Sequence, residues 1–246
     1  MLPRSFLVSP GSTTLLTLTV GENFVGDQVA FTSPLVASLR QYSLGKAVDL
    51  RDRVPANEQL PELPVVVSQA GTYLVAFDTH PSQLVLSADK FHAYLHEEGL
   101  DFIIKSREAA GNAALPGRER FRRNIKTLLQ AGTRGDATYA VRTGQKLEIV
   151  PLANPSAQKR GGDMAFQVLF DGKPLANALV KSWHKRGGQT LIIRTITNGE
   201  GKVTVALPWS GAWMVSVVHM VPVTDSQDHD WDSYWGNLTF ALPEKQ

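Results

Sequence analysis

The chain has 246 residues, of which 43% are hydrophobic and 20% are charged, and this composition is typical of a folded globular protein rather than a disordered chain. The formal net charge is +2, from 25 basic and 23 acidic residues, so no overall electric field favours nucleic acid or an anionic membrane as a partner. Cysteine is absent, which excludes disulfide bonds and thiolate metal sites.

The first residues, "MLPRSFLVSPG", contain one arginine and no long apolar run, so we expect no signal peptide within them. No later stretch approaches the roughly 18 consecutive apolar residues that a membrane-spanning helix needs. The sequence therefore predicts a chain that does not insert into a membrane.

Alternation of apolar and polar residues with a period of two dominates the chain and predicts β-strands. The clearest examples are "TLLTLTV" at 14–20, "TYLVAF" at 72–77, "MAFQVLF" at 164–170, "KVTVAL" at 202–207 and "AWMVSVVHM" at 212–220. The Asp-Gly pair in "FDGKPL" and the Asn-Gly pair in "TNGEGK" predict hairpin turns, because both pairs tolerate positive φ. The sequence thus predicts an all-β protein.

A helical insert interrupts this pattern at about 87–111. Ser87 is placed to cap a helix, and the apolar residues of "ADKFHAYLHEEG" share one helical face before Gly99 ends it. The next stretch, "LDFIIKSREAAG", continues the helical pattern to Gly111.

The segment "RERFRRNIKTLLQAG" at 118–132 fits either a helix or a strand, and we favour a strand. As a strand it carries Phe121, Ile125 and Leu129 on one face and polar residues on the other. The basic residues of this segment are Arg118, Arg120, Arg122, Arg123 and Lys126. Aromatic residues between them are few, so we expect a solvated face rather than a phosphate or nucleic-acid site.

The polar, glycine-containing segment 133–146 is the best linker in the chain. All five tryptophans follow it, so the two halves differ in core composition. We predict two β-sandwich domains, at 1–145 with the helical insert and at 146–246 with an immunoglobulin-like or transthyretin-like fold. Trp213, Trp231 and Trp235 are expected to close the core of the second domain.

The segment "SQDHDWDSYW" at 226–235 allows two interpretations. His219 and His229 with Asp230 and Asp232 offer nitrogen and oxygen ligands for nickel or cobalt, provided that a strand end and a loop converge at one edge of the sandwich. Alternatively the acids cap turns while the aromatic residues of the segment fill the core. The sequence leaves both interpretations open.

The remaining histidines suggest no site. His92 and His96 lie four residues apart on the predicted helix but lack the glutamate of a hydrolase motif, so a solvated helix face is expected. His80 and His184 lie in predicted turns and are expected to be surface residues. No nucleophile elbow, phosphate-binding loop or dinucleotide fingerprint is present, so we predict a protein that is not an enzyme.

Several segments resemble a family of uncharacterised bacterial periplasmic proteins, commonly labelled the periplasmic, substrate-specific component of cobalt and nickel uptake. They are "PGSTTLLTLTVGENFVGD" at 10–27, "AYLHEEGLDFII" at 93–104, "GRERFRRNIKTLLQAG" at 117–132, "LEIVPLANP" at 147–155, "LFDGKPLANALV" at 169–180 and "DWDSYWGNLTF" at 230–240. In that family a signal peptide and a segment like His-Asp-Phe-Trp precede the residues that correspond to "LPRSFLVSPG". The second half also resembles the transthyretin-like modules of carboxypeptidases, through "GKPLANALV", "TNGEGKVTVAL" and "GAWMVSVVH".

The resemblance implies a periplasmic, non-enzymatic binding protein for nickel or cobalt that works with a metal-uptake system in the membrane. The alternative is a structural or adhesion-type β-sandwich that binds protein or glycan without a metal. Stoichiometric metal in the purified protein would distinguish the first function from the second.

Overall fold

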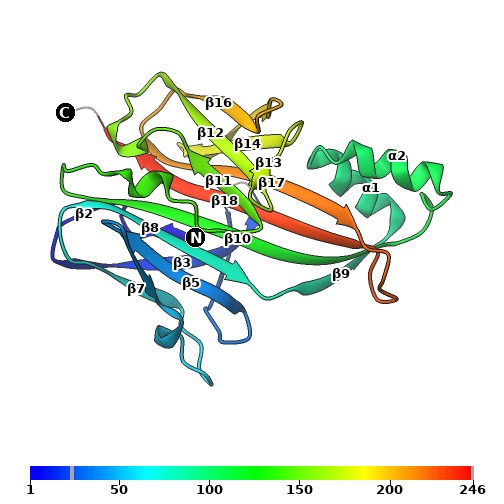
Figure 1. Ribbon diagram of the computed structural model, residues 1–246, viewed down its shortest axis with the longest axis horizontal. Coiled ribbons are helices and arrows are strands. Elements are labelled where there is room, and N and C mark those ends of the chain that lie inside the picture. Colours follow the sequence, from blue (N-terminus) through cyan, green and yellow to red (C-terminus); the bar gives the residue numbers. More distant parts are fainter. Residues whose placement is uncertain (23–24, 245–246) are drawn as a thin grey trace.

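A computed structural model describes residues 1–22 and 25–244 and shows three β-sheets with a short helical insert (Figure 1). The first sheet contains β1 (Leu2–Pro3), β3 (Ser12–Glu22), β4 (Val25–Val29) and β7 (Glu62–Val67). The third contains β11 (Leu147–Pro151), β12 (Gly162–Phe170), β13 (Lys173–Pro174) and β16 (Lys202–Leu207). The all-β prediction is confirmed.

The second sheet is the largest and runs through the middle of the molecule (Figure 1). Its ten strands are β2 (Leu7–Val8), β5 (Val36–Ser43), β6 (Lys46–Asp49), β8 (Gly71–Thr79), β9 (Ser82–Leu86), β10 (Gly117–Ala131), β14 (Leu179–Arg186), β15 (Gln189–Ile196), β17 (Gly211–Pro222) and β18 (Trp231–Leu242). Three 3₁₀ turns, η1 (Arg51–Arg53), η2 (Ala137–Ala140) and η3 (Pro155–Ala157), lie in the connections. The strand predicted at 118–132 is confirmed as β10.

The two smaller sheets pack on opposite faces of the central sheet. Neighbouring residues of a strand point to opposite faces, and Leu128 belongs to the core with β11, β12 and β16, whereas Leu129 belongs to the core with β3 and β7. Leu74 and Val75 of β8 divide between the same two cores. These two hydrophobic cores of the described residues therefore share one sheet.

The central sheet crosses the boundary that we predicted near residue 145. β10 from the first half pairs in parallel with β18 from the second half, in a register that runs from Glu119 opposite Trp231 to Thr127 opposite Thr239. Segment 133–146 connects β10 to β11 and contains η2. The first core is built from the first half alone, whereas the second core includes residues of both halves. Whether either half folds alone stays a prediction, and the shared sheet argues against it.

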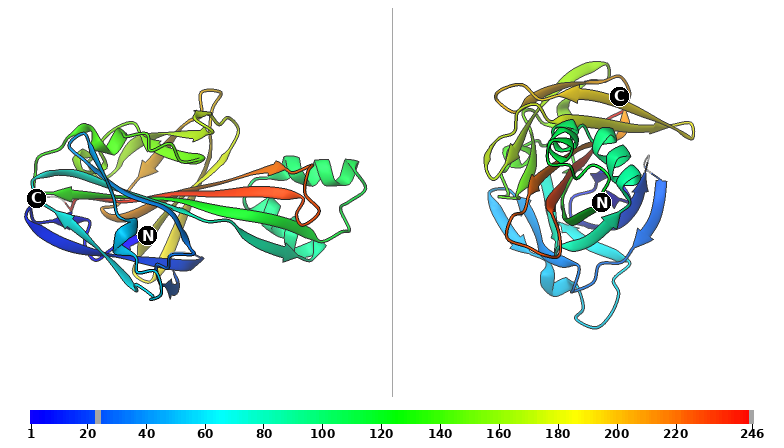
Figure 2. Two further views of the ribbon diagram at one scale, coloured as in Figure 1. Left: turned by 60° about the horizontal axis from the view of Figure 1, so that its bottom comes forward. Right: turned by 90° about the vertical axis from the view of Figure 1, so that its right-hand side faces the viewer.

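The strands β10, β17 and β18 extend beyond the sandwich as an arm, and the helical insert lies at the end of this arm (Figure 2). The helices α1 (Ala88–Glu97) and α2 (Asp101–Ala109) form a helical hairpin between the paired strands β9 and β10. A Cβ atom on Gly117 would lie 2.1 Å from the ring of Phe91, so glycine at this position of β10 allows α1 to approach closely. Neither described helix has the length and apolarity needed to cross a membrane.

The polar face of β10 is only partly solvated, contrary to our expectation. Lys126, Asn124 and Gln130 are buried, because the third sheet covers the second half of the strand. The Lys126 ammonium donates hydrogen bonds to the Glu148 carboxylate and to the carbonyl of Ile149, both in β11. A buried ion pair therefore joins the central sheet to the third sheet.

His184, which we expected at the surface, is also buried. It lies within β14, and its ring is 4.6 Å from that of Trp213 and 5.6 Å from that of Trp209. The turn that we predicted around "SWHKRGG" begins only after Arg186, so the histidine belongs to the strand and its ring faces the core.

Candidate functional site

Two of the three aspartates of segment 226–235, Asp230 and Asp232, are bound by arginines of β10. Arg118 donates two hydrogen bonds to Asp230, at 3.0 and 2.6 Å, and Arg120 donates two to Asp232, at 2.7 and 2.8 Å. Arg122 adds a longer contact of 3.3 Å to Asp232. These paired contacts form an arginine–aspartate ladder across the parallel strands β10 and β18.

The ladder also fixes the charge of the carboxylates. The hydrogen bond from Arg118 holds the pKa of Asp230 below its ordinary value, and the hydrogen bond from Arg120 does the same for Asp232, although partial burial opposes both shifts. Both aspartates are thus kept ionised by guanidinium groups. A divalent cation at Asp232 would have to share the carboxylate with two arginines, whose charge repels it.

The structure does not bring the four predicted metal ligands together. The ring of His219 lies 4.4 Å from that of Phe170 and 6.4 Å from that of Phe102, and burial lowers its pKa. His229 contacts Ser226 through Nδ1, and its Nε2 is 3.8 Å from Oδ1 of Asp232. Among the residues that the structure describes, no group of three or more histidine or acidic side chains is placed to hold a metal ion.

The helical hairpin packs against Trp231 and Trp235 on one face of β10 and β18, and we call a set of six residues on this face the hairpin face. It consists of Glu119 and Arg123 of β10 and of Trp231, Ser233, Trp235 and Asn237 of β18. In the parallel register Glu119 lies opposite Trp231, and Arg123 lies opposite Trp235. All six residues share one face because side chains of a strand alternate between the two faces.

Two tryptophans on this face correct our expectation for the second core. Trp213 packs in the second core as predicted, whereas Trp231 packs under the hairpin with Phe91 and Leu95 of α1. Trp235 stacks on Tyr94 of α1, with ring centroids 5.5 Å apart and planes 6° apart. The reason is the alternation along β18, which turns Leu238 and Phe240 toward the sandwich but Trp231 and Trp235 toward the helices.

Unsatisfied polar atoms concentrate on the hairpin face. Six buried side-chain atoms in the described part of the chain have no hydrogen-bond partner, and four of them are Glu119 Oε1, Trp231 Nε1, Ser233 Oγ and Asn237 Oδ1. An unpaired buried polar group costs about 1–3 kcal/mol, so such groups gather only where water or a ligand satisfies them, or where function requires them.

Glu119 is an acid held in an apolar environment. Its residue surface is 1% exposed, and burial raises the pKa of its carboxyl. The Tyr94 hydroxyl donates one weak hydrogen bond of 3.3 Å to Oε2, and burial raises the pKa of Tyr94 well above its ordinary value. The proximity of Ser233 lowers the pKa of both groups, although its hydroxyl makes no hydrogen bond to either of them.

Arg123 supplies the unpaired cation of this face. Its side chain is partly buried, and desolvation lowers the pKa of its guanidinium. The guanidinium carbon lies 4.8 Å from the ring centroid of Phe121, and no hydrogen bond or ion pair to another described side chain reaches it. The hairpin face therefore presents a partly desolvated cation without an ion-pair partner among the described side chains, although Glu119 on the same face acts on its charge.

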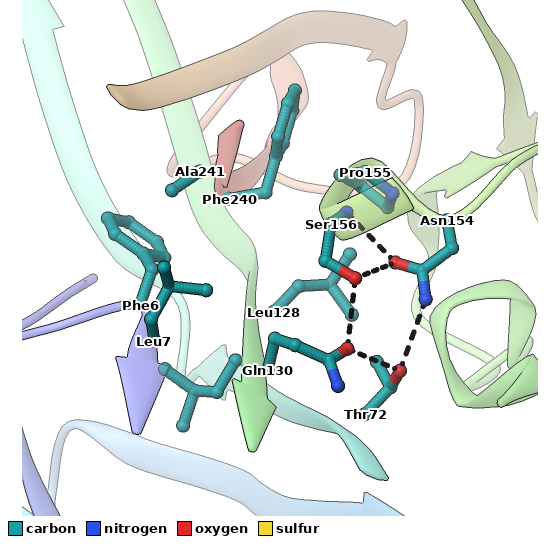
Figure 3. Close-up of a pocket in the computed structure, with 11 residues that line it drawn as sticks. Phe6, Leu7, Thr72, Leu128, Gln130, Asn154, Pro155, Ser156, Phe240 and Ala241 are labelled. Atoms are coloured by element: carbon teal, nitrogen blue, oxygen red, sulfur yellow. Dashed lines mark hydrogen bonds between the residues drawn. The ribbon is translucent and has the colours of Figure 1, made fainter. Parts of the chain in front are cut away.

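The hollow shown in Figure 3 has a structural role. Its volume is about 10 Å³, enough for about one water molecule. Gln130 Oε1 accepts hydrogen bonds from Thr72 and Ser156, and Asn154 bonds both Thr72 and Ser156. This closed network ties the end of β10 to η3 and leaves no polar group for a ligand.

A broader hollow of about 300 Å³ lies between the β5–β6 hairpin and β7. Two of its polar side chains already bond the backbone of β7, since Gln41 donates to the carbonyl of Val66 and Arg53 to the carbonyl of Pro64. These contacts hold the open edge of the first sandwich together.

The comparison with protein families assigns the chain. The model of DUF4198, described as a domain of unknown function, matches residues 1–221. The chain belongs to the DUF4198 family. A search of the curated proteins found no match to it. The matched range includes Glu119 and Arg123 of the hairpin face and ends before β18. The description of this family names no function, so the match gives no support to a role in metal uptake.

Sequence reasoning overlooked the residues of the hairpin face in this DUF4198 chain. Arg123 was grouped with the basic residues of a solvated face. Alternation along β10, however, places Arg123 on the face that Phe121 shares and Arg122 on the other face. One signal was available, because Glu119, Phe121 and Arg123 share a face with Ile125, which the apolar pattern assigns to a core. That placement of charged residues on an apolar face could have marked the site.

Proposed function

We propose that this DUF4198 protein is a non-enzymatic binding protein that acts outside the cytoplasm and holds its ligand at the hairpin face. The proposal combines the resemblance to periplasmic binding components with the polar groups that the helical hairpin covers. The hairpin supplies a wall of apolar side chains, and β10 and β18 supply a floor with a cation and unpaired polar atoms. Such a mixture is typical of ligand sites.

The observation that carries the proposal is the unpaired guanidinium of Arg123. Partial burial removes water from the charge, and Glu119, which stabilises the charge from the same face, makes no ion pair with it. Desolvating a charge destabilises the folded protein, so a desolvated cation is typical of a site where the charge has a function. A bound anion would replace the stabilisation that water no longer gives to the guanidinium.

The contact between Ser226 and His229 has the residue types of a catalytic pair but not its supporting geometry. Ser226 lies 3.0 Å from Nδ1 of His229, but its hydroxyl also accepts the backbone N–H of Asp228, as in an ordinary turn. The nearby carboxylate of Asp232 is bound by arginines. It is therefore not free to orient and charge the histidine as a catalytic triad requires.

Thermal unfolding in the presence of anions tests the proposal. Acetate, phosphate and citrate are the probes, and the variants are Arg123→Gln and the control Arg142→Gln, which removes an exposed guanidinium far from the hairpin. At least one anion should raise the melting temperature of the wild type and of the control but not that of Arg123→Gln. Equal responses of all three proteins to every anion would contradict the proposal.

A second candidate function is association with nickel or cobalt uptake, with a membrane transport system as partner. One observation favours it: Nε2 of His229 is buried, lacks a hydrogen-bond partner and faces Asp232. Neutral imidazole nitrogen beside a carboxylate is a usual ligand pair for these metals. The three arginines around the ladder oppose it.

Calorimetric titration with nickel decides this second candidate. A micromolar binding event present in the wild type and absent from the His219→Ala, His229→Ala double variant would support a metal site that includes these histidines and Asp230 or Asp232. Equal weak heats from both proteins would exclude it. Binding should weaken as the pH falls, because protonated imidazole does not bind metal.

A further inference from the structure

The charge on the hairpin face favours a ligand with a single negative charge. Arg123 is the unpaired cation there, and the acid Glu119 lies four residues away on the same face of β10, near enough to stabilise the charge of Arg123. A carboxylate matches one guanidinium in two parallel hydrogen bonds. A phosphate dianion would meet one cation and one acid, which suits it less.

The ring of Trp235 offers a flat apolar surface beside this cation. Trp235 lies directly opposite Arg123 in the register, and stacking on Tyr94 fixes the orientation of its ring. The ring is partly exposed, unlike that of Trp213 in the second core. Aromatic rings held in this way pack against the C–H faces of sugars and against other flat groups.

The side-chain oxygen of Asn237 is an acceptor that a hydrogen-bond donor on a ligand could satisfy. Its Oδ1 is buried and has no partner, and it stands two residues beyond Trp235 on the same face. Two residues along a strand span about 7 Å, which is about the length of one sugar ring with its substituents. A ligand with a carboxylate at one end and a hydroxyl group at the other could therefore reach Arg123 and Asn237 together.

We infer that the hairpin face binds a sugar acid, whose carboxylate pairs with Arg123, whose ring lies against Trp235 and whose hydroxyl groups bond Asn237. The inference rests on the proposed function and narrows it to one class of ligand. The other unpaired polar atoms of the face, on Glu119, Trp231 and Ser233, take no part in this contact.

Calorimetric titration with three probes tests the inference. Glucuronate carries ring, hydroxyls and carboxylate, glucose lacks the carboxylate, and acetate lacks the ring. For the wild type we expect glucuronate to bind at least about tenfold more tightly than either of the others, because charged hydrogen bonds and ring contacts act together. Glucuronate binding no tighter than acetate binding would overturn the inference.

Two variants assign the contacts. Arg123→Gln should reduce the affinity for glucuronate to that for glucose, and Asn237→Ala should weaken glucuronate at least about threefold while leaving acetate unchanged. Arg142→Gln is the control and should bind as the wild type does. Retained glucuronate preference in Arg123→Gln would overturn the inference.

The outcomes separate the inference from the proposed function. A protein that responds to acetate, phosphate or citrate through Arg123 but shows no preference for glucuronate retains the function and loses the inference. A protein that responds to no anion loses both. The comparison of probes on the wild type alone decides the inference if a variant fails to fold.

Discussion

Replacing Glu119 with glutamine should make the stability of the protein less dependent on pH. The carboxyl group is 1% exposed, its Oε1 has no hydrogen-bond partner, and the hydroxyl of Tyr94 gives Oε2 a single weak hydrogen bond. Arg123 is the cation that acts on it, and Glu98 of α1 acts on Tyr94. Glutamine keeps the shape of the side chain and removes its titration.

The sign follows from the raised pKa. Burial lifts the pKa of Glu119 above its ordinary value of 4.5, so between these two values the folded protein holds a proton that the unfolded chain has lost. The stabilisation is complete below the ordinary pKa and is lost as the pH rises through the folded pKa. Within that window the free energy of unfolding of the wild type falls by up to about 1.4 kcal/mol per pH unit from this group.

Denaturant unfolding of both proteins from about pH 5 to about pH 8 measures the effect. The stability of Glu119→Gln relative to the wild type should rise with pH and then level off above the folded pKa. The control Glu108→Gln changes an exposed residue of α2, and its difference from the wild type should stay within about 0.5 kcal/mol at every pH. A flat difference for Glu119→Gln over the same range would refute the reasoning.

Three further predictions concern the fold. Lys126→Met leaves the Glu148 carboxylate buried without its cation and should lower the free energy of unfolding by about 3–5 kcal/mol. The control Lys146→Met removes an exposed ion pair and should lower it by less than about 1 kcal/mol. Equal losses of the two variants in denaturant unfolding would contradict this prediction. Trp235→Ala should lower the melting temperature, at a cost of about 2–3 kcal/mol for a ring that is partly exposed, and an unchanged melting curve would show that the ring contributes nothing to hairpin packing. A fragment of residues 147–246 should show no cooperative melt, because β18 loses its partner β10, and a sharp calorimetric transition would show that the second half folds alone.

Local patterns predicted the elements of the fold well. Alternation identified β10 as a strand despite its many arginines, and the apolar helical face located the hairpin at α1 and α2. Ser87 stands at the N-cap position of α1 as predicted, but its side chain makes no capping hydrogen bond. These signals depend on neighbours within a few residues, which a sequence displays directly.

The pairing of distant strands was beyond such patterns. Asp230 and Asp232 look like metal ligands in isolation, but in the structure they bind arginines that lie 112 residues earlier in the chain. The sharing of one sheet by both halves has the same origin, since the parallel register of β10 and β18 is a long-range contact. The hairpin face was missed for this reason as well, because its residues meet only through that register.

The central claim, that a ligand binds at the hairpin face, is tested most directly by the indole N–H signals in a ¹H–¹⁵N correlation spectrum. The chain has five tryptophans; Trp231 and Trp235 lie on that face, and Trp209 and Trp213, which pack in the second core, serve as internal controls. On addition of glucuronate the signals of Trp231 and Trp235 should move in a saturable way while those of Trp209 and Trp213 stay in place. Movement confined to the two control signals, or no movement at any concentration, would contradict this.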